Sequence, residues 1–183
     1  MKKIVIIGPE STGKSTVSEQ LAQHYDCLWC PEFAREYLLT KGTDYHYDDL
    51  LNIAKGQLAL EEEYVQMSAG SQLIANNSKL LFIDTDMYVM KVWCEFVYGN
   101  CHRFILDQIT ERHYDLYLLC NVDLPWVKDE LREYPDLKTR NQLYLIYRDL
   151  MINQQVAWVE ISGSHETRLQ KSIEAVNNLI RTG

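Results

Sequence analysis

The fold is decided near the N-terminus, by the stretch Ile4-Val5-Ile6-Ile7-Gly8-Pro9-Glu10-Ser11-Thr12-Gly13-Lys14-Ser15. Its first four residues are apolar and β-branched, as in a strand that is buried on both faces of a sheet. The next eight residues match the pattern G-x-x-x-x-G-K-[ST] in full. Apolar residues at helical spacing then follow as far as Tyr25. A strand, a glycine-containing turn and a helix in this order predict a loop that wraps a chain of phosphates.

The residues of this loop have the chemistry that phosphate binding needs. Glycine is required at Gly8 and Gly13, because a Cβ atom would block the close approach of backbone N–H groups to a phosphate. Lys14 would reach the β- and γ-phosphates and Ser15 would bind Mg²⁺, while the helix N-terminus adds partial positive charge. The alternative, a chance match in a glycine turn, does not account for the flanking strand and helix. The residues expected to bind ATP are Gly8, Glu10, Ser11, Thr12, Gly13, Lys14, Ser15 and Thr16.

Short apolar runs alternate with helical stretches along the rest of the chain. Further runs of strand length lie at 27–33, 80–83, 116–119 and 156–161. Apolar residues at helical spacing lie at 48–67, 87–96 and 165–181. This alternation predicts an α/β fold, a doubly wound parallel sheet of five strands with helices on both faces. No linker-like stretch interrupts it, so we expect one domain over residues 1–183.

Composition and charge exclude several classes of protein. Among the 183 residues 46% are hydrophobic, an ordinary value for a globular chain. No apolar run approaches the roughly 20 residues of a membrane-spanning helix, and Gly8 and Pro9 interrupt any signal peptide. We therefore expect a soluble, cytoplasmic protein with no membrane partner. The 18 Lys and Arg against 26 Asp and Glu give a formal net charge of −8, which argues against nucleic acid as a partner.

Two acidic residues follow the apolar run 80–83. Ligands of open α/β sheets bind beyond the carboxyl ends of the strands, so Asp84 is expected near the phosphate loop. There it would hold Mg²⁺ or the waters around it. Asp86 would face the same cleft if the chain is still extended. The alternative is that one of the two aspartates caps the next helix.

Charged residues also gather where the second apolar run ends. Glu32, Arg35 and Glu36 would bring two carboxylates and a guanidinium to the same edge of the sheet. A carboxylate at that edge can accept the proton of an acceptor hydroxyl in a small-molecule kinase. The alternative is a pattern of charges on a solvated helix face.

The polar segment from about 123 to 141 breaks the alternation of strands and helices. It contains Pro125 and Pro135, and its cations include Arg132 and Arg140. Phosphoryl transfer is catalysed mostly by positioning and by cations placed on the developing charge. We therefore expect a lid whose arginines stabilise the transferred group. An exposed charged helix without a catalytic part is the alternative.

Taken together, these motifs resemble the NadR-type ribosylnicotinamide (nicotinamide riboside) kinase domain, a P-loop kinase family. The resembling segments occur in the same order in this chain, at 8–15, 32–36, 82–86, 114–116, 126–129 and 131–132. The resemblance extends over about residues 3–165, and the phosphate loop alone would not be specific. It implies a P-loop kinase fold in which the strand carrying Asp84 lies beside the first strand.

The resemblance also implies an activity, the ATP-dependent phosphorylation of the 5′-hydroxyl of nicotinamide riboside with Mg²⁺. Either Glu32 or Asp86 would then orient the acceptor hydroxyl. Arg35, Glu36 and Trp126 would line the nucleoside pocket, Trp126 by stacking on the cationic pyridinium ring. The expected catalytic residues are Lys14, Glu32, Asp84, Asp86, Arg132 and Arg140.

Two other functions fit the same motifs. One is a P-loop kinase for a different nucleoside or nucleotide, and the other is a regulator that binds ATP without transferring phosphate. The multifunctional members of the family also carry a helix-turn-helix domain and a nucleotidyltransferase domain, which this sequence does not show. We therefore expect neither a repressor role nor adenylyl transfer.

Overall fold

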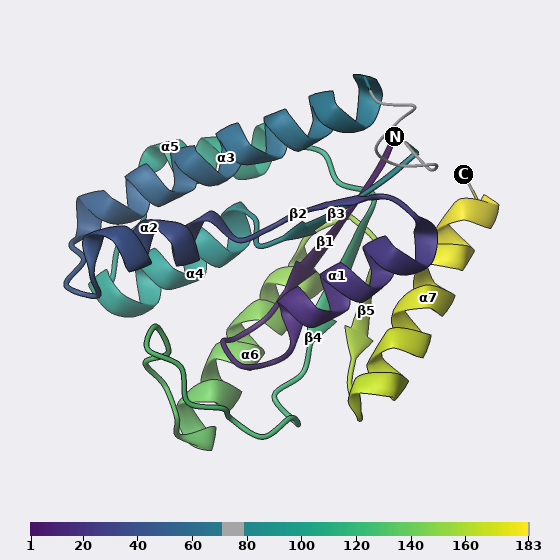
Figure 1. The fold of residues 1–183 in the computed structure, drawn as a ribbon. Coiled ribbons are helices and arrows are strands. Elements are labelled where there is room, and N and C mark those ends of the chain that lie inside the picture. The colour runs from purple at the N-terminus through teal and green to yellow at the C-terminus, as the bar shows by residue number, and fades with distance from the viewer. Residues whose placement is uncertain (71–78, 183) are drawn as a thin grey trace.

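Five strands form one sheet in the computed structural model, which describes residues 1–70 and 79–182. The strands are β1 (Lys2–Ile7), β2 (Leu28–Cys30), β3 (Leu80–Asp84), β4 (Leu116–Cys120) and β5 (Trp158–Ile161). They are all parallel and lie in the order β2-β3-β1-β4-β5 (Figure 1). The predicted five-stranded parallel sheet is confirmed, and β3 lies beside β1 as the resemblance implied.

Helices cover both faces of this sheet. They are α1 (Lys14–Tyr25), α2 (Phe33–Lys41), α3 (Tyr47–Gly70), α4 (Met87–Tyr98), α5 (Arg103–Glu111), α6 (Leu137–Asn153) and α7 (His165–Thr182). α1 and α7 pack side by side on one face, and α3, α4 and α6 pack on the other (Figure 1). The doubly wound architecture is therefore confirmed.

The central strand β1 shows why the sequence adopts this layered fold. Ile4 and Ile6 point to the face covered by α1 and α7, whereas Val5 and Ile7 point to the opposite face. All four side chains are fully buried, and each contributes roughly 1.5–3 kcal/mol from the removal of apolar surface from water. Ile6 is in register with Asp84 of β3. The register therefore brings the carboxyl end of β3 beside the loop that follows β1.

The second strand is much shorter than the predicted run 27–33. It ends at Cys30, and α2 begins only three residues later, at Phe33. Pro31 has no backbone N–H to give to a neighbouring strand, so pairing stops there. Glu32 is extended, with φ −71° and ψ 116°, and occupies the N-cap position of α2. The predicted strand is therefore wrong over its last three residues.

Three helices were not predicted from the sequence as separate elements, namely α2, α5 and α6. The polar segment after β4 is irregular from 121 to 136, and α6 begins at Leu137. The expected lid of about 123–141 is therefore too long at its C-terminal end. We use lid from here on as the name of residues 121–136, whose closing over the site stays a prediction. Within the described parts of the chain, no helix combines the length and the apolar character that crossing a bilayer requires.

Candidate active site

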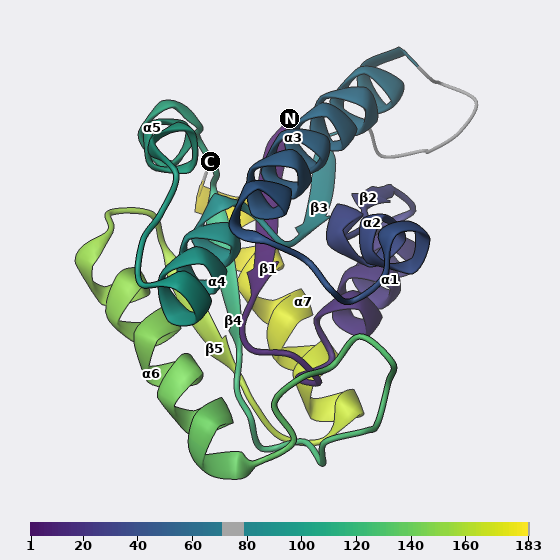
Figure 2. The ribbon, with the colours of Figure 1, turned by 90° about the vertical axis from the view of Figure 1, so that its left-hand side faces the viewer.

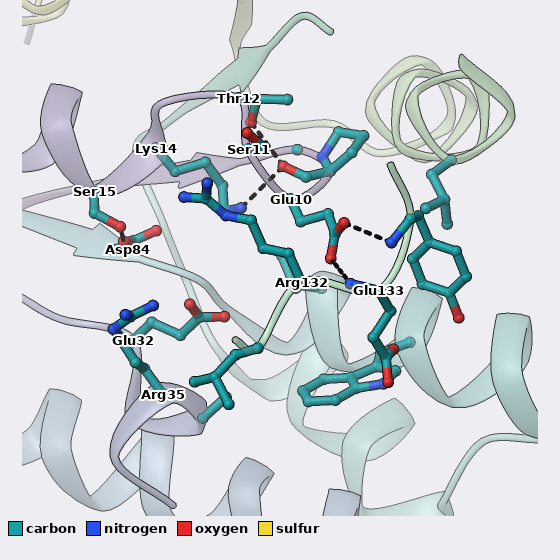
Figure 3. Close-up of a pocket in the computed structure, with 18 of the residues that line it drawn as sticks. Glu10, Ser11, Thr12, Lys14, Ser15, Glu32, Arg35, Asp84, Arg132 and Glu133 are labelled. Atoms are coloured by element: carbon teal, nitrogen blue, oxygen red, sulfur yellow. Dashed lines mark hydrogen bonds between the residues drawn. The ribbon is translucent and has the colours of Figure 1, made fainter. Parts of the chain in front are cut away.

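The phosphate loop between β1 and α1 has the tight geometry that its glycines predict. Gly8 has a φ of 139°, and a Cβ there would come within 2.7 Å of the carbonyl oxygen of Cys120. Gly13 adopts a left-handed conformation, with φ 79°, just before α1 begins. Lys14 Nζ donates a 3.1 Å hydrogen bond to the carbonyl of Pro9 across the loop (Figure 3). All eight residues expected to bind ATP line one cavity, which is described below.

Ser15 and Asp84 meet beside this loop, as predicted for a magnesium site. Ser15 Oγ donates a 2.5 Å hydrogen bond to Asp84 Oδ2. Asp84 is fully buried, and its Oδ1 has no hydrogen-bond partner among the described residues. Burial, and next the charge of Glu32, raise the pKa of Asp84 to about 6, while Lys14 and Ser15 lower it. A hydroxyl oxygen and a buried carboxylate with one unpartnered oxygen fit a hard, oxygen-seeking cation such as Mg²⁺.

The phosphate loop opens onto a cavity of about 360 Å³. Charged side chains of Glu32, Arg132 and Glu133 face it together with Lys14 (Figure 3). The rest of the wall is largely apolar, and aromatic residues are prominent in it. These aromatic residues are Trp29, Tyr45, Trp93, Phe96, Tyr134 and Tyr147. The cavity therefore joins a charged, phosphate-binding end to an aromatic end suited to a flat organic group.

Glu32 is held in the cavity wall by a residue that the sequence analysis did not single out. Gln57 of α3 is 1% exposed, and its amide forms hydrogen bonds with the backbone on both sides of Glu32. Gln57 Oε1 accepts from the backbone N–H of Phe33 at 2.7 Å, and Nε2 donates to the carbonyl of Pro31 at 3.2 Å. The ring of Phe33 lies so close to Gly56 that any Cβ there would overlap it. α3 therefore fixes the backbone on both sides of Glu32.

Glu10 of the phosphate loop connects the loop to the lid. Its Oε1 accepts from Trp126 Nε1 at 3.1 Å and from the backbone N–H of Tyr134 at 2.7 Å. Its Oε2 accepts from the backbone N–H of Glu133 at 2.9 Å. Figure 2 shows the lid running beside the loop between β1 and α1. One carboxylate therefore sets the position of both ends of the lid relative to the phosphate loop.

Arg140 supports the same junction from α6 and does not enter the cavity. It is 3% exposed, and Nη2 donates to the carbonyls of Ser11 and Leu124, each at 3.2 Å. Ser11 Oγ also accepts from the backbone N–H of Val127 at 3.0 Å. The structure therefore does not support the expected catalytic role of Arg140, because its side chain does not line the cavity and its hydrogen bonds join the phosphate loop to the lid from behind the wall residue Ser11.

Two arginines at the cavity wall have different hydrogen-bond partners. Arg132 of the lid donates to the carbonyl of Val127 at 2.5 Å, and its side chain extends toward Lys14 (Figure 3). Arg35 of α2 makes a two-point ion pair with Asp129 of the lid, at 3.0 and 3.3 Å. This ion pair lowers the pKa of Asp129. Arg132 therefore reaches toward Lys14 at the phosphate end, and its role in stabilising the transferred group stays a prediction, while Arg35 fastens the lid to α2.

Asp86 is not a cavity residue, which corrects the expectation that it faces the acceptor. It is 2% exposed, and its Oδ1 accepts from the backbone N–H groups of Tyr88 and Val89 at the start of α4. Its Oδ2 accepts from the hydroxyl of Tyr117 at 2.8 Å. Burial raises its pKa to about 7, against the effect of these hydrogen bonds. The alternative of a helix cap is therefore the correct one for Asp86.

Two of the residues expected to line the nucleoside pocket lie elsewhere. Trp126 is absent from the cavity wall, and its indole N–H is used by Glu10. Glu36 is exposed on α2 and does not line the cavity. Of the charged group at the start of α2, only Glu32 and Arg35 reach the cavity. Glu36 departs from the expectation because α2 begins at Phe33 and leaves its side chain exposed, whereas Trp126 departs because its indole N–H is bound to Glu10.

Arg168 of α7 is a further structural residue that sequence reasoning missed. It is fully buried and donates to the carbonyls of Thr12, Asn121 and Gly163 at 2.8–3.0 Å. It also forms an ion pair with Asp123. A cation at helical spacing is ordinarily interpreted as exposed, so nothing local distinguished it. Arg168 therefore fixes the phosphate loop against the ends of β4 and β5.

This chain is similar in sequence and fold to known proteins. The model of a protein family described as an AAA domain matches residues 3–168. The trifunctional NAD biosynthesis/regulator protein NadR of Escherichia coli strain K12 is 25% identical over 185 residues. The match covers 98% of this chain and 43% of that protein, so the chain spans less than half the length of this relative.

Solved structures share the fold at low sequence identity. A structure of NadR protein in complex with NR is 22% identical and has a TM-score of 0.73, covering 97% of this chain and 49% of that one. Thymidylate kinase from Ehrlichia chaffeensis is 15% identical with a TM-score of 0.59, covering 96% of this chain and 98% of that one. The fold is therefore that of P-loop kinases.

Proposed function

We propose that this chain, which belongs to the AAA domain family, phosphorylates the 5′-hydroxyl of nicotinamide riboside with ATP, giving nicotinamide mononucleotide. The observation that carries the proposal is one cavity that contains the phosphate loop, Asp84, Glu32, Arg132 and an aromatic end. The sequence likeness to NadR, whose solved structure contains NR, supports this choice of nucleoside.

In this proposal the phosphate loop binds the triphosphate of ATP. Backbone N–H groups of the loop and Lys14 Nζ contact the phosphate oxygens, and Arg132 approaches from the lid. Ser15 and Asp84 hold Mg²⁺. When bound, Mg²⁺ neutralises the negative charge on the phosphates.

Glu32 is the group that we assign to the acceptor hydroxyl. The oxygen of the 5′-hydroxyl forms a bond to the γ-phosphorus as the bond from that phosphorus to the β–γ bridging oxygen breaks. Glu32 accepts the hydroxyl proton, and ADP leaves. Of the two carboxylates proposed from the sequence, Glu32 lines the cavity and Asp86 does not. The hydrogen bonds from Gln57 to the chain on both sides of Glu32 support its fixed position.

A nucleoside fits the acceptor end better than a nucleotide does. A nucleoside monophosphate would bring two negative charges, which need cations to bind them. At that end the cavity has the carboxylates of Glu32 and Glu133, and the guanidinium of Arg35 is already paired with Asp129. These charges favour an acceptor that carries no phosphate.

The test is a turnover assay with the purified chain, ATP and Mg²⁺ against a panel of nucleosides and nucleoside monophosphates. We expect ADP release to be stimulated most by nicotinamide riboside, with nicotinamide mononucleotide identified by mass. Preference for a neutral purine or pyrimidine would overturn the substrate. ATP hydrolysis that no acceptor stimulates would favour the regulatory alternative.

A further inference from the structure

The aromatic end of the cavity contains an oriented carboxylate that the proposed reaction does not use. Glu133 belongs to the lid and lines the cavity. Figure 3 places it on the other side of Arg132 from Ser15 and Asp84, away from the phosphate-binding end. In the proposed function, this is the end of the cavity that would receive the base of the nucleoside.

A chain of hydrogen bonds fixes the direction of this carboxylate. Trp93 Nε1 donates to the hydroxyl of Tyr45 at 2.9 Å, and that hydroxyl donates to Glu133 Oε2 at 3.0 Å. The backbone N–H of Glu133 is held in turn by Glu10 at 2.9 Å. Both the main chain and the side chain of Glu133 are therefore oriented before any ligand binds, which reduces the entropy lost on binding.

Aromatic side chains line the cavity together with Glu133. Tyr45 and Trp93 meet edge to face with centroids 5.1 Å apart, and Phe96 meets Tyr134 in the same way at 5.4 Å. All four rings line the cavity and are only half-buried. Ring faces attract cations through their quadrupole, and the attraction grows when the cation is desolvated.

Glu133 has no ion-pair partner in the described part of the chain. Among the ion pairs formed by residues 1–70 and 79–182, none includes Glu133. Glu133 is an exposed residue, and the partial burial of its carboxyl raises the pKa of that group, while the hydrogen bond from Tyr45 opposes the rise. A carboxylate near aromatic rings, with no ion-pair partner among the described residues, is complementary to a flat group that carries positive charge.

We propose that Glu133, oriented by Tyr45 and Trp93, is a specificity residue that selects an acceptor with a positively charged aromatic ring over a neutral ring of the same shape. This inference rests on the proposed function for the identity of the acceptor. The inference goes beyond the proposed function in two ways. It predicts that the protein recognises the positive charge of the ring as well as its shape, and it names Glu133 as the group that recognises this charge.

The test compares two nucleosides that differ only at one ring atom. Nicotinamide riboside has a pyridinium ring, and the corresponding benzamide C-nucleoside has carbon in place of the charged nitrogen. Dissociation constants are measured by calorimetry with Mg²⁺ and a non-hydrolysable ATP analogue, and kcat/KM is measured with ATP. We expect the wild-type chain to prefer the cation by about tenfold or more in both measurements.

Glu133→Gln keeps the shape of the side chain and removes its charge. This variant should lower the preference by about fivefold to tenfold, chiefly by weakening binding of the cationic nucleoside. Tyr45→Phe keeps the ring but removes the hydroxyl that orients the Glu133 carboxylate. This variant should lower the preference for the cation by a smaller factor. Glu95→Gln is the matched control, because Glu95 is exposed on the same helix as Trp93 and does not line the cavity.

The outcomes separate this inference from the proposed function. Phosphorylation of both nucleosides at similar kcat/KM would overturn the inference and leave the kinase intact. An equal loss for both nucleosides in Glu133→Gln would also overturn it, since Glu133 would then bind a shared group such as the ribose. Selective, Glu133-dependent binding of the cation without turnover would support the inference and overturn the proposed reaction. Binding of neither compound would overturn both.

Discussion

Glu10 and Trp126 lie 116 positions apart in the chain and are joined by a 3.1 Å hydrogen bond from the indole N–H to the carboxylate. The same carboxylate accepts from the backbone N–H groups of Glu133 and Tyr134. A residue of the phosphate loop therefore holds the lid in place. This contact also connects the two ends of the cavity, because Glu133 and Tyr134 line its aromatic end.

Glu10→Ala should therefore weaken acceptor binding without unfolding the protein. Hydrogen bonds to a charged group contribute about 1.5–3 kcal/mol each, so KM for the acceptor should rise at least tenfold while KM for ATP changes less. Trp126→Phe removes only one of the three bonds and should have a smaller effect. Steady-state kinetics with each substrate varied in turn check this. A rise in KM for ATP alone would mean that Glu10 serves the nucleotide and not the lid.

Exchanging each of two carboxylates for its amide should distinguish their roles. Glu32→Gln removes the proposed proton acceptor and should lower kcat by roughly 10²–10⁴-fold. Asp86→Asn should lower kcat less than tenfold, because its amide oxygen can still accept from the N–H groups that Asp86 caps. Single-turnover measurements with saturating ATP and nucleoside provide the comparison. The reverse order of effects would restore Asp86 as the acceptor residue.

Gln57 should act on catalysis through the position of Glu32. Gln57→Leu keeps the volume of the side chain but leaves the N–H of Phe33 and the carbonyl of Pro31 without their partner. We expect kcat to fall while KM for ATP is unchanged, and stability to fall by about 1–3 kcal/mol. Denaturant unfolding measures the second effect. Gln57→Glu retains an acceptor for Phe33 and should recover part of the activity, whereas a purely structural role predicts no such recovery in kcat.

Asp84→Asn should remove the magnesium-dependent step and leave the fold intact. The variant keeps an oxygen for Ser15 but loses the buried negative charge that would hold Mg²⁺. We expect turnover to fall by at least about 100-fold. Burial raises the pKa of the Asp84 carboxyl, so the ligand-free variant should unfold at the same temperature as the wild type or higher. Calorimetry with and without Mg-ATP checks both points. Near-normal turnover would contradict the assignment of Asp84.

Acid should weaken the fold through Asp49, which lies in the first turn of α3. Its carboxylate accepts from Lys41, from the hydroxyl of Tyr37 and from the N–H of His46, and these contacts, Lys41 first, hold its pKa well below 3.8. The folded state therefore binds this proton less tightly than the unfolded state does. The resulting stability is present above about pH 4 and is lost as the pH falls further. Asp49→Asn should lower Tm at pH 7, and its difference from the wild type should shrink below pH 4. A constant difference would contradict this account.

The sequence was most informative about features that depend on residues close together in the chain. The phosphate loop, the buried strands and the position of Asp84 all follow from patterns within a few residues, and the structure places them together. Asp84 was predictable because the end of a parallel strand is always near the ligand side of the sheet. The resemblance to NadR-type domains added the order of β3 beside β1.

Residues whose roles depend on distant partners could not be assigned from the sequence. Whether Asp86 faces the cavity or caps α4 depends on the hydroxyl of Tyr117, 31 residues away. Trp126 was expected to stack on a base because it is aromatic, but its N–H is taken by Glu10. Glu133 gave no local signal at all, since its orientation comes from Tyr45 in the loop between α2 and α3. These roles arise from tertiary contacts between elements, which local patterns do not encode.

Arg168 has a consequence for how the chain reaches its native state. Its guanidinium bonds the carbonyl of Thr12, and the two residues are 156 positions apart. The phosphate loop therefore reaches its final shape only after these two distant residues have met. Bringing them together is slow, because closing so long a loop costs conformational entropy. Refolding followed in real time should accordingly show competence to bind nucleotide appearing late, after most helical signal has returned.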